Sequence, residues 1–429
     1  MNTLHTVVLD DDPTGTQSVS DVPVILDWSD PAVLEPAAGA GALYMLTNSR
    51  ALDPAEAHSY VRDAALAVHR TGAKPQFILR GDSTLRGHLL EEYLAVHDVL
   101  KGAHPPYVLV PALPSAGRVT VGGVHYLARD GHRQPLADTE YARDPVFTYH
   151  NSALTAWAEE RSGGFFAAGV GAGLSLERLR VGGPQAVADR IEELARSGPP
   201  AVFAPDAETD QDIALIGEGI RLLLGSPAQP IVRSAPALAA YLSGHAAHGL
   251  SALPAADDGV VVLCGSHVPA TTRQLEHLEH RHPGTLITAD LEALDSADPA
   301  SEIRSLADAA DASLAAHGLA VVATPRALST EHSGLDSSRR IADRLARVLH
   351  EMARLPRTVV AKGGITSAVV ARTGLKAAVA HAEGPVLTGL ARWTVEGGLG
   401  RRTLIVFPGN VGEPETLADL IDQLRGTHA

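Results

Sequence analysis

The segment TVVAKGGITS, residues 358–367, passes from an apolar run through two glycines into a stretch with helical spacing. This succession of strand, loop and helix is the repeating unit of a parallel sheet covered by helices. It recurs along the chain, with an amphipathic helix expected over 336–354. Short apolar runs that end at polar, glycine or proline loops predict strands at 6–9, 43–46, 77–79, 107–110, 201–204, 260–264, 286–288, 320–323, 358–361 and 403–407. The sequence therefore predicts an α/β fold.

The length of the chain predicts two domains. At 429 residues it exceeds the roughly 250 to 300 residues at which a single hydrophobic core stops growing. Residues 243–259 combine glycine, alanine, histidine, serine and proline without a helical or strand period, which is typical of a linker. We therefore expect domains at 1–245 and 246–429, each with a mainly parallel sheet flanked by helices.

The composition argues against several function classes. The formal net charge is −15 and no cluster of lysine and arginine occurs, so neither nucleic acid nor a membrane surface is an expected partner. Aromatic residues make up 4% of the chain, which is unfavourable for stacking bases. The single cysteine, Cys264, and the lack of an apolar stretch of about 18 residues predict a soluble, cytoplasmic protein.

Three loops in the second half have the character of phosphate sites. Gly363-Gly364-Ile365-Thr366, Gly265-Ser266 and Gly409-Asn410 each follow an apolar run. Glycines let backbone N–H groups approach an anion, hydroxyls add hydrogen bonds, and the N-terminus of a following helix supplies positive potential. Each loop alone could be a simple turn, and it is their joint occurrence that predicts a nucleotide site. The chain has neither a P-loop nor a Gly-x-Gly-x-x-Gly after its first apolar run.

The first half carries acids, hydroxyls and arginines at the ends of its apolar runs. The run at 6–9 leads into Asp10-Asp11-Asp12-Pro13-Thr14-Gly15, the second into Ser49-Arg50, and the third into Asp82-Ser83 with Arg86 close behind. Three adjacent carboxylates repel one another unless a cation or a proton-transfer task gives them a purpose. Arg50 and Arg86 are natural forks for a substrate carboxylate, although each could equally form an ion pair with a neighbouring acid.

Together these loops resemble the four-carbon acid sugar kinase family, which includes threonate, erythronate and 3-oxo-tetronate kinases. The resemblance covers nearly the whole chain, and its most specific element is Asp-Ser-Thr-Leu-Arg-Gly at 82–87. Two positions depart from the family pattern: Asp10, where the family usually has alanine, and Phe407-Pro408, where Lys-Ser is often found. The other matching segments are 11–15, Ser49-Arg50, Asp206-Ala207, Gly265-Ser266, 363–366 and 409–412.

The resemblance implies two domains that close over an active site in the cleft between them, with a sugar acid held by the N-terminal domain and ATP, as its Mg²⁺ complex, by the C-terminal one. Asp12 is expected to orient or deprotonate the acceptor hydroxyl, and Asp11 to assist it or bind Mg²⁺. Residues expected to hold the acid are Thr14, Gly15, Ser49, Arg50, Asp82, Ser83 and Arg86. Those expected to hold ATP are Ser266, Gly363, Gly364, Ile365, Thr366, Gly409 and Asn410. Which acid is used, and whether the chain forms a homodimer, stay open.

Two other functions compete with this interpretation. Asp10 and Asp12 after an apolar run also fit the Asp-x-Asp-x-Thr signature of haloacid dehalogenase-like phosphatases, with Asp10 as nucleophile. That fold needs a later acidic pair after a strand, whereas Asp257-Asp258 precedes one here. The second alternative is a non-catalytic sugar-acid sensor, which would bind the acid without consuming ATP.

Overall fold

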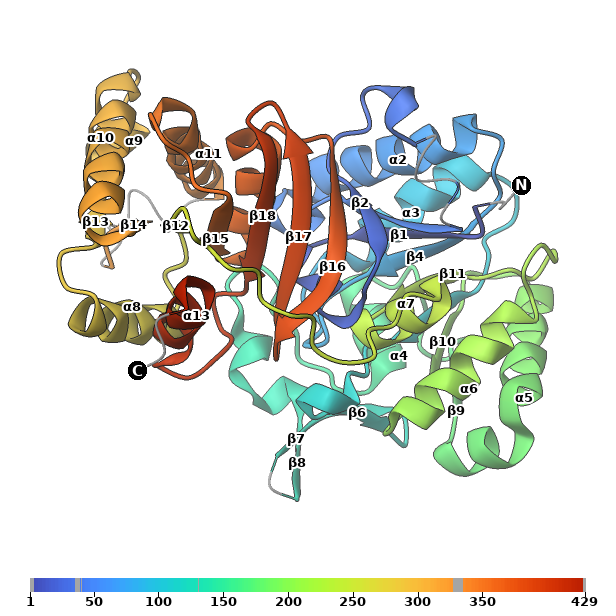
Figure 1. Ribbon diagram of the computed structural model, residues 1–429. Coiled ribbons are helices and arrows are strands. Elements are labelled where there is room, and N and C mark those ends of the chain that lie inside the picture. The colour runs from blue at the N-terminus through green and yellow to red at the C-terminus, as the bar shows by residue number, and fades with distance from the viewer. Residues whose placement is uncertain (1–3, 35–38, 40, 130, 327–334, 427–429) are drawn as a thin grey trace. The chain divides into compact units, whose positions relative to one another are not determined.

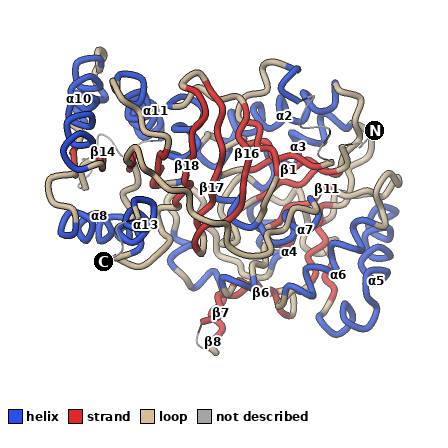
Figure 2. The backbone as a smooth tube through the Cα atoms, viewed as in Figure 1, coloured by secondary structure: helices blue, strands red, loops and turns tan. Residues whose placement is uncertain are grey.

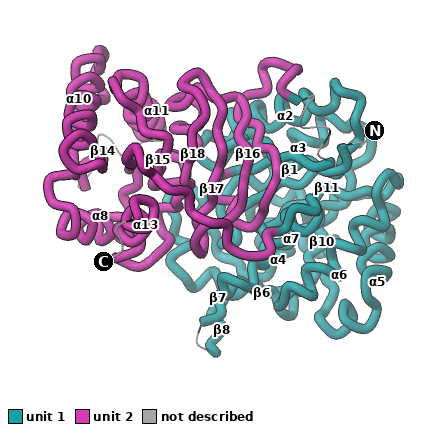
Figure 3. The backbone as a smooth tube through the Cα atoms, viewed as in Figure 1, with its two compact units in different colours: residues 1–11, 34–246 teal, residues 12–33, 247–429 magenta. Residues whose placement is uncertain are grey.

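The computed structural model describes residues 4–34, 39, 41–129, 131–326 and 335–426. The chain divides into two compact units, coloured separately in Figure 3. Unit 1 comprises residues 1–11 and 34–246, and unit 2 comprises 12–33 and 247–429. This division differs from a single cut near residue 245, because residues 12–33 group with the C-terminal part of the chain.

Unit 1 is built on a parallel sheet whose central strands are fully buried. β1 (Thr6–Asp10) lies between β3 (Ala42–Leu46) and β4 (Gln76–Arg80), and every residue of these three strands is buried. Such two-sided burial explains why the strands are continuous apolar runs. Beyond β4 the sheet continues in the order β11 (Ile231–Ser234), β5 (Tyr107–Val110), β10 (Val202–Pro205) and β9 (Ala172–Leu174).

Helices cover the unit 1 sheet in two groups (Figure 1). α2 (Pro54–Arg70) begins with a capping box between Asp53 and Glu56 and packs on α3 (Leu89–Leu100). The second group packs α5 (Leu176–Ser197) on α6 (Asp210–Arg221), which in turn contacts α7 (Pro236–Ser243). The stretch between β5 and α5 also holds a small antiparallel sheet and a short helix: β6 (Arg118–Val121), β7 (Val124–Arg129), β8 (His132–Pro135) and α4 (Leu154–Arg161).

The sheet of unit 2 has a parallel and an antiparallel part. The parallel strands lie in the order β13 (Leu286–Thr288), β14 (Leu319–Ala323), β12 (Val260–Cys264), β15 (Thr358–Lys362) and β18 (Gly400–Phe407). The order then continues with antiparallel neighbours, β17 (Leu390–Gly397), β16 (Val379–Leu387) and β2 (Val22–Ile25). Figure 2 shows β16, β17 and β18 as the long strands of this unit.

Helices of unit 2 cover both faces of its parallel strands. α8 (Pro269–Arg281) and α13 (Thr416–Arg425) pack on the face formed by Val260, Val262 and Cys264. A separate group consists of α9 (Leu291–Asp295), α10 (Ala300–His317), α11 (Leu335–Glu351) and α12 (Gly364–Val369), the last continuing into a π-helix at Val370–Gly374. No helix among the described residues is long and apolar enough to cross a membrane.

All ten expected strands are present, with ends that differ by at most three residues from the prediction. The sequence patterns did not reveal the short strands β2, β9 and β11, the antiparallel pair β16 and β17, or the β6–β8 sheet. β11 is informative, because its four residues include a buried arginine, Arg233, which breaks the apolar run that marks a central strand.

Candidate active site

The end of β1 places two carboxylates among arginines in unit 1. Asp10 and Asp11 are each 1% exposed. The Arg80 guanidinium forms an ion pair with Asp10, and its Nη1 lies 3.3 Å from Oδ1 of Asp11. Arg50 donates to both oxygens of Asp11, from Nη2 at 2.9 Å and from Nε at 3.2 Å. The repulsion expected within the acidic run is therefore offset by two arginines from neighbouring strand ends.

The loop after β4 holds Asp82 and Arg86 as a second ion pair. Nε of Arg86 donates to Oδ2 of Asp82 at 2.7 Å, and Asp144 lies 3.7 Å from the same guanidinium. Burial alone would raise the pKa of Asp82, but the charges of Arg86 and Arg50 and the hydrogen bonds hold it well below its usual range. Arg86 is 25% exposed, so one side of this pair stays accessible to a ligand.

This loop is held in a conformation that ordinary residues seldom adopt. Leu85 is buried at φ +67° and Gly87 follows at φ +111°. A β-carbon at Gly87 would lie 2.8 Å from the Arg233 guanidinium and 3.2 Å from a carboxylate oxygen of Asp11. Glycine at position 87 therefore allows the loop to approach the charged cluster closely.

A buried pair supports the cluster, and the sequence patterns did not reveal it. Arg233 of β11 and Glu92 of α3 are 4% and 2% exposed. Nη1 of Arg233 lies 2.5 Å from Oε2 of Glu92. Ser49, expected to hold the acid, donates its hydroxyl to Glu92 at 2.7 Å, so this hydroxyl already has an internal partner. Ser83, also expected to contact the acid, is buried, and its carbonyl lies 2.9 Å from Nε2 of His125. The burial of Glu92, which creates this support, is visible only in the structure.

Asp206 lies in the Asp-Ala segment that matches the family pattern. Its carboxylate binds the backbone of the small antiparallel sheet. Its two carboxylate oxygens accept hydrogen bonds from the N–H groups of Gly122 at 2.7 Å and Gly123 at 2.8 Å. Asp206 is 3% exposed. It therefore fixes the turn between β6 and β7 instead of presenting a charge to solvent.

Asp12, Thr14 and Gly15 belong to unit 2, although the sequence placed them with the acid-binding half. Asp12 accepts a hydrogen bond from the Thr14 N–H at 2.8 Å and so caps the 3₁₀ helix Pro13–Ser18. A β-carbon at Gly364 would lie 2.6 Å from Oδ2 of Asp12. The carboxylate of Asp12 therefore lies directly against the glycine loop that follows β15, and a larger residue at position 364 would displace it.

The three glycine loops of unit 2 contact one another. They follow β12, β15 and β18, and parallel strands bring their carboxyl ends to one edge of the sheet. A β-carbon at Gly265 would lie 2.6 Å from Oγ1 of Thr366, and one at Gly409 would lie 2.3 Å from Oγ of Ser266. Thr271 bridges two of the loops, because its hydroxyl donates to the Gly409 carbonyl at 2.9 Å and lies 3.0 Å from the Ser266 hydroxyl.

Other predicted residues of this region are spread over different environments. Gly363 has φ +121° and Thr366 is 4% exposed, while Gly364 and Ile365 are half-buried and Asn410 is exposed. Arg326, which the sequence patterns did not single out, donates to the carbonyls of Ser266 and Thr324, each at 2.7 Å. Together these contacts form a surface of glycines, hydroxyls and backbone amides that suits phosphate oxygens.

A buried lysine holds the third loop in place. Lys362, the last residue of β15, is 0% exposed, and its Nζ donates to the carbonyl of Pro408 at 2.8 Å and lies 3.4 Å from that of Val411. The same ammonium lies 3.5 Å from the centre of the Phe407 ring. Burial lowers the pKa of Lys362 to about 7. The Phe407-Pro408 departure from the family pattern is thus accompanied by a lysine on the adjacent strand.

The described residues offer little to a resident metal ion. They contain no group of three or more His, Cys, Asp or Glu side chains that could hold one. Asp11, the expected Mg²⁺ ligand, is surrounded by the guanidinium groups of Arg50 and Arg80, which repel a cation. This arrangement favours an electrostatic and structural role for Asp11 and does not fit a metal ligand.

Asp10 is equally unsuited to act as a phosphatase nucleophile. A nucleophilic carboxylate must be able to reach a substrate phosphorus. Asp10 is 1% exposed and forms an ion pair with Arg80. The structure therefore gives no support to the phosphatase alternative.

Comparisons with known proteins divide the chain into an N-terminal and a C-terminal domain. Residues 6–242 match the family described as "Sugar-binding N-terminal domain", and residues 261–417 match "Nucleotide-binding C-terminal domain". The fold and these matches define a protein with one domain for a sugar and one for a nucleotide. The chain belongs to the four-carbon acid sugar kinase family.

Curated relatives and solved structures give the degree of similarity. The chain is 34% identical over 257 residues to D-erythronate kinase of Heliobacterium modesticaldum, a match that covers 58% of this chain and 52% of that protein. It is 25% identical over 356 residues to D-threonate kinase of Salmonella typhimurium, covering 79% of this chain and 78% of the relative. The fold is similar to solved structures from Salmonella typhimurium LT2 (TM-score 0.72, 19% identity, all of both chains) and Haemophilus influenzae (TM-score 0.65, 17% identity, 98% and 99%).

Proposed function

We propose that the protein is an ATP-dependent kinase that phosphorylates a hydroxyl of a four-carbon sugar acid of the threonate, erythronate or 3-oxo-tetronate type. Membership of the family and the activities of two relatives, a D-erythronate kinase and a D-threonate kinase, support this proposal. The observation that carries it is the division of the acidic run: Asp10 and Asp11 belong to the arginine cluster of unit 1, whereas Asp12 lies against Gly364 in unit 2. The chain itself thus links the proposed acid site to the proposed phosphate loop.

The acid is held in this proposal by the exposed side of the cluster in unit 1. Arg86 and Arg50 are 25% and 17% exposed, while their partners Asp82 and Asp11 fix the guanidinium planes. A substrate carboxylate would then meet pre-oriented N–H donors, which reduces the entropy lost on binding. The ion pairs therefore serve to position the arginines.

The nucleotide is held by the three loops of unit 2, with Ser266, Thr366 and the backbone of Gly363 and Gly364 near its phosphates. When the ATP complex is bound, its Mg²⁺ would supply charge neutralisation at the transferred group. Asp12 orients the acceptor hydroxyl and takes its proton as the oxygen attacks the terminal phosphorus and the bond to the departing ADP breaks. A base placed in this way contributes about 100-fold to 10,000-fold to the rate.

A screen for acid-dependent ADP release tests the proposal. The purified protein is incubated with ATP, Mg²⁺ and each of D- and L-threonate, D- and L-erythronate and their 3-oxo forms, with acid-free samples as blanks. We expect ADP release with at least one acid and a phosphorylated acid detectable by mass spectrometry. Binding of an acid without ADP release would instead support the sensor alternative, and a phosphoryl adduct on Asp10 would support a phosphatase.

A further inference from the structure

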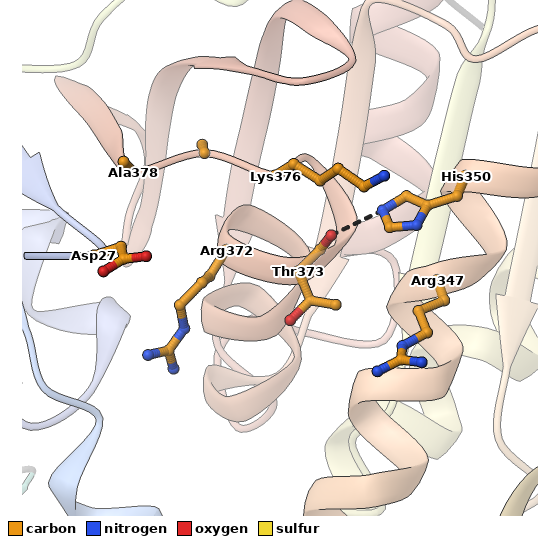
Figure 4. Close-up of a pocket in the computed structure, with 8 residues that line it drawn as sticks. Asp27, Arg347, His350, Arg372, Thr373, Lys376 and Ala378 are labelled. Atoms are coloured by element: carbon orange, nitrogen blue, oxygen red, sulfur yellow. Dashed lines mark hydrogen bonds between the residues drawn. The ribbon is translucent and has the colours of Figure 1, made fainter. Parts of the chain in front are cut away.

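A pocket in unit 2 is lined by none of the residues of the three glycine loops. Its volume is about 540 Å³, and Figure 4 shows the side chains that surround it. They come from α11, from the π-helix Val370–Gly374, from the segment before β16 and from the turn after β2. Its charged and polar lining residues are Asp27, Arg347, His350, Arg372, Thr373 and Lys376.

The lining of this pocket is strongly cationic. Among the described residues, its lining contains Arg347, Arg372 and Lys376 beside one acid, Asp27, although the whole chain has a net charge of −15. Hydrogen bonds from Ser29, and then the charge of Arg372, lower the pKa of Asp27, so this acid is ionised at neutral pH. Arg347 also pairs with Asp343 on its own helix at 2.8 Å. Cations gathered in this way in an acidic protein create a local site for an anion.

Lys376 adopts a backbone conformation that glycine would adopt at lower cost. Its φ is +52°, in the left-handed region that most residues avoid. The residue is exposed, and its carbonyl accepts a hydrogen bond from Gly398 at 3.2 Å. Non-glycine residues in the left-handed region cluster at ligand sites and switch segments, and the exposed Lys376 side chain is accessible to a ligand.

His350 connects the two helical elements of the pocket. Its Nε2 donates to the Thr373 carbonyl at 2.8 Å, drawn as the dashed line in Figure 4. The Lys376 side chain extends toward this imidazole in the same view. Thr373 lies in the π-helix, a wide turn that occurs frequently at functional sites. The hydrogen bond fixes the orientation of the imidazole at the edge of the pocket.

We propose that this pocket binds a small organic phosphate, with Arg372 and Lys376 as the principal contacts of the phosphate group. A guanidinium fork and an ammonium group together suit the oxygens of a phosphate dianion. The volume lies within the roughly 300 to 1,000 Å³ of small-molecule sites and exceeds what an inorganic ion needs. The ligand is therefore expected to contribute an organic part as well as its charge.

The pocket and the phosphate loop after β15 are connected by one continuous helical segment. α12 begins at Gly364, and the π-helix that carries Arg372 continues directly from it. One helical segment thus has the proposed nucleotide contact, Gly364, near its start and the proposed phosphate contact of the pocket, Arg372, near its end.

Isothermal titration of the whole protein with 3-phosphoglycerate tests the proposal. Glycerate and inorganic phosphate are the two control ligands, because each carries one half of the recognised chemistry. The variants are Arg372→Met and Lys376→Gly, with Arg304→Met on α10 as a charge-matched exposed control. Arg86→Lys is titrated in parallel, to separate this pocket from the acid site of unit 1.

We expect 3-phosphoglycerate to bind at least tenfold more tightly than either control ligand. Arg372→Met and Lys376→Gly should each weaken binding by about tenfold, whereas Arg304→Met and Arg86→Lys should leave it unchanged. The melting temperature of Lys376→Gly should stay level or rise, because glycine relieves the backbone strain. The proposal is overturned if 3-phosphoglycerate does not bind, if the control ligands bind as well, or if binding depends on Arg86 and not on Arg372 and Lys376.

Discussion

The two candidate sites recognise their ligands with different parts of the chain. In unit 1 the groups at the strand ends are charged side chains, most of them buried and paired with one another, such as Asp11 with Arg50 and Asp82 with Arg86. In unit 2 the corresponding loops present glycines, hydroxyls and backbone. A site made of side chains should lose ligand affinity when a side chain is shortened or neutralised. A site made of glycines and backbone should lose affinity when a substitution adds a side chain.

The largest loss of activity is expected for a substitution of Asp12, the residue of the acidic run that belongs to unit 2. Asp12→Asn keeps the shape of the side chain but removes the base, so the rate of acid-dependent ADP release should fall by about 100-fold to 10,000-fold. The affinity for ATP, measured by titration, should stay within about twofold. Near-normal turnover would exclude Asp12 as the base.

Asp10→Asn provides the contrasting variant, because Asp10 is buried against Arg80 and has no catalytic task in the proposed mechanism. Removing one partner of a buried ion pair costs about 3 to 5 kcal/mol, so the melting temperature should fall sharply. A stable Asp10→Asn protein that is catalytically inactive would contradict this assignment.

The addition of one methyl group should disable the nucleotide site. In Gly409→Ala the new β-carbon would lie 2.3 Å from the Ser266 hydroxyl, so ATP affinity should fall by about tenfold to 100-fold. Ser266→Ala alone should weaken ATP binding about tenfold, because it removes a hydrogen bond to a charged oxygen.

The double variant, Gly409→Ala with Ser266→Ala, sharpens the test. It removes the clashing hydroxyl and should therefore bind ATP better than the sum of the two single losses predicts. Gly169→Ala is the control, since a β-carbon there meets no atom within 4 Å. Strictly additive losses would show that the hydroxyl and the glycine do not share one site.

The buried lysine predicts a dependence of stability on pH. The pKa of Lys362 is about 7 in the folded protein and 10.5 when exposed, so between these values the unfolded chain binds the proton and the folded chain does not. Stability should therefore rise as the pH rises from 7 to about 10, by roughly 3 to 4 kcal/mol.

Lys362→Met should lack this rise, since it cannot bind a proton. Denaturant unfolding of both proteins at pH 7, 8.5 and 10 gives the difference, which cancels the contributions of other titrating groups. Parallel pH profiles would mean that the ammonium is compensated by the carbonyls of Pro408 and Val411 and the Phe407 ring.

The smallest effect is expected for a substitution that keeps the charge. Arg86→Lys retains the cation but loses the fork that Asp82 orients, so affinity for the acid should fall by about tenfold while affinity for ATP persists. Arg62→Lys on α2 is the exposed control. A lowered melting temperature with unchanged acid affinity would make Arg86 a purely structural residue.

Sequence patterns predicted the frame of the molecule well because buried parallel strands are continuous apolar runs. β12 and β15 are examples, and the glycines that follow them mark the loops. The side-chain cluster was predicted in part: the acids and arginines were found, but not which acid pairs with which arginine. Pairing depends on strand order, and β11 brings Arg233 to α3 from 141 residues along the chain. No local pattern contains that information.

Residues 12–33 are an integral part of unit 2. β2 pairs with β16, and Trp393 donates its indole N–H to the Thr16 hydroxyl at 2.9 Å. A fragment that starts at residue 247 would therefore expose one edge of β16 and leave a buried indole without its acceptor. Exchange of the nucleotide half between family members by one crossover near residue 246 would separate these partners. Functional chimaeras should therefore require that residues 12–33 and 247–429 are exchanged together.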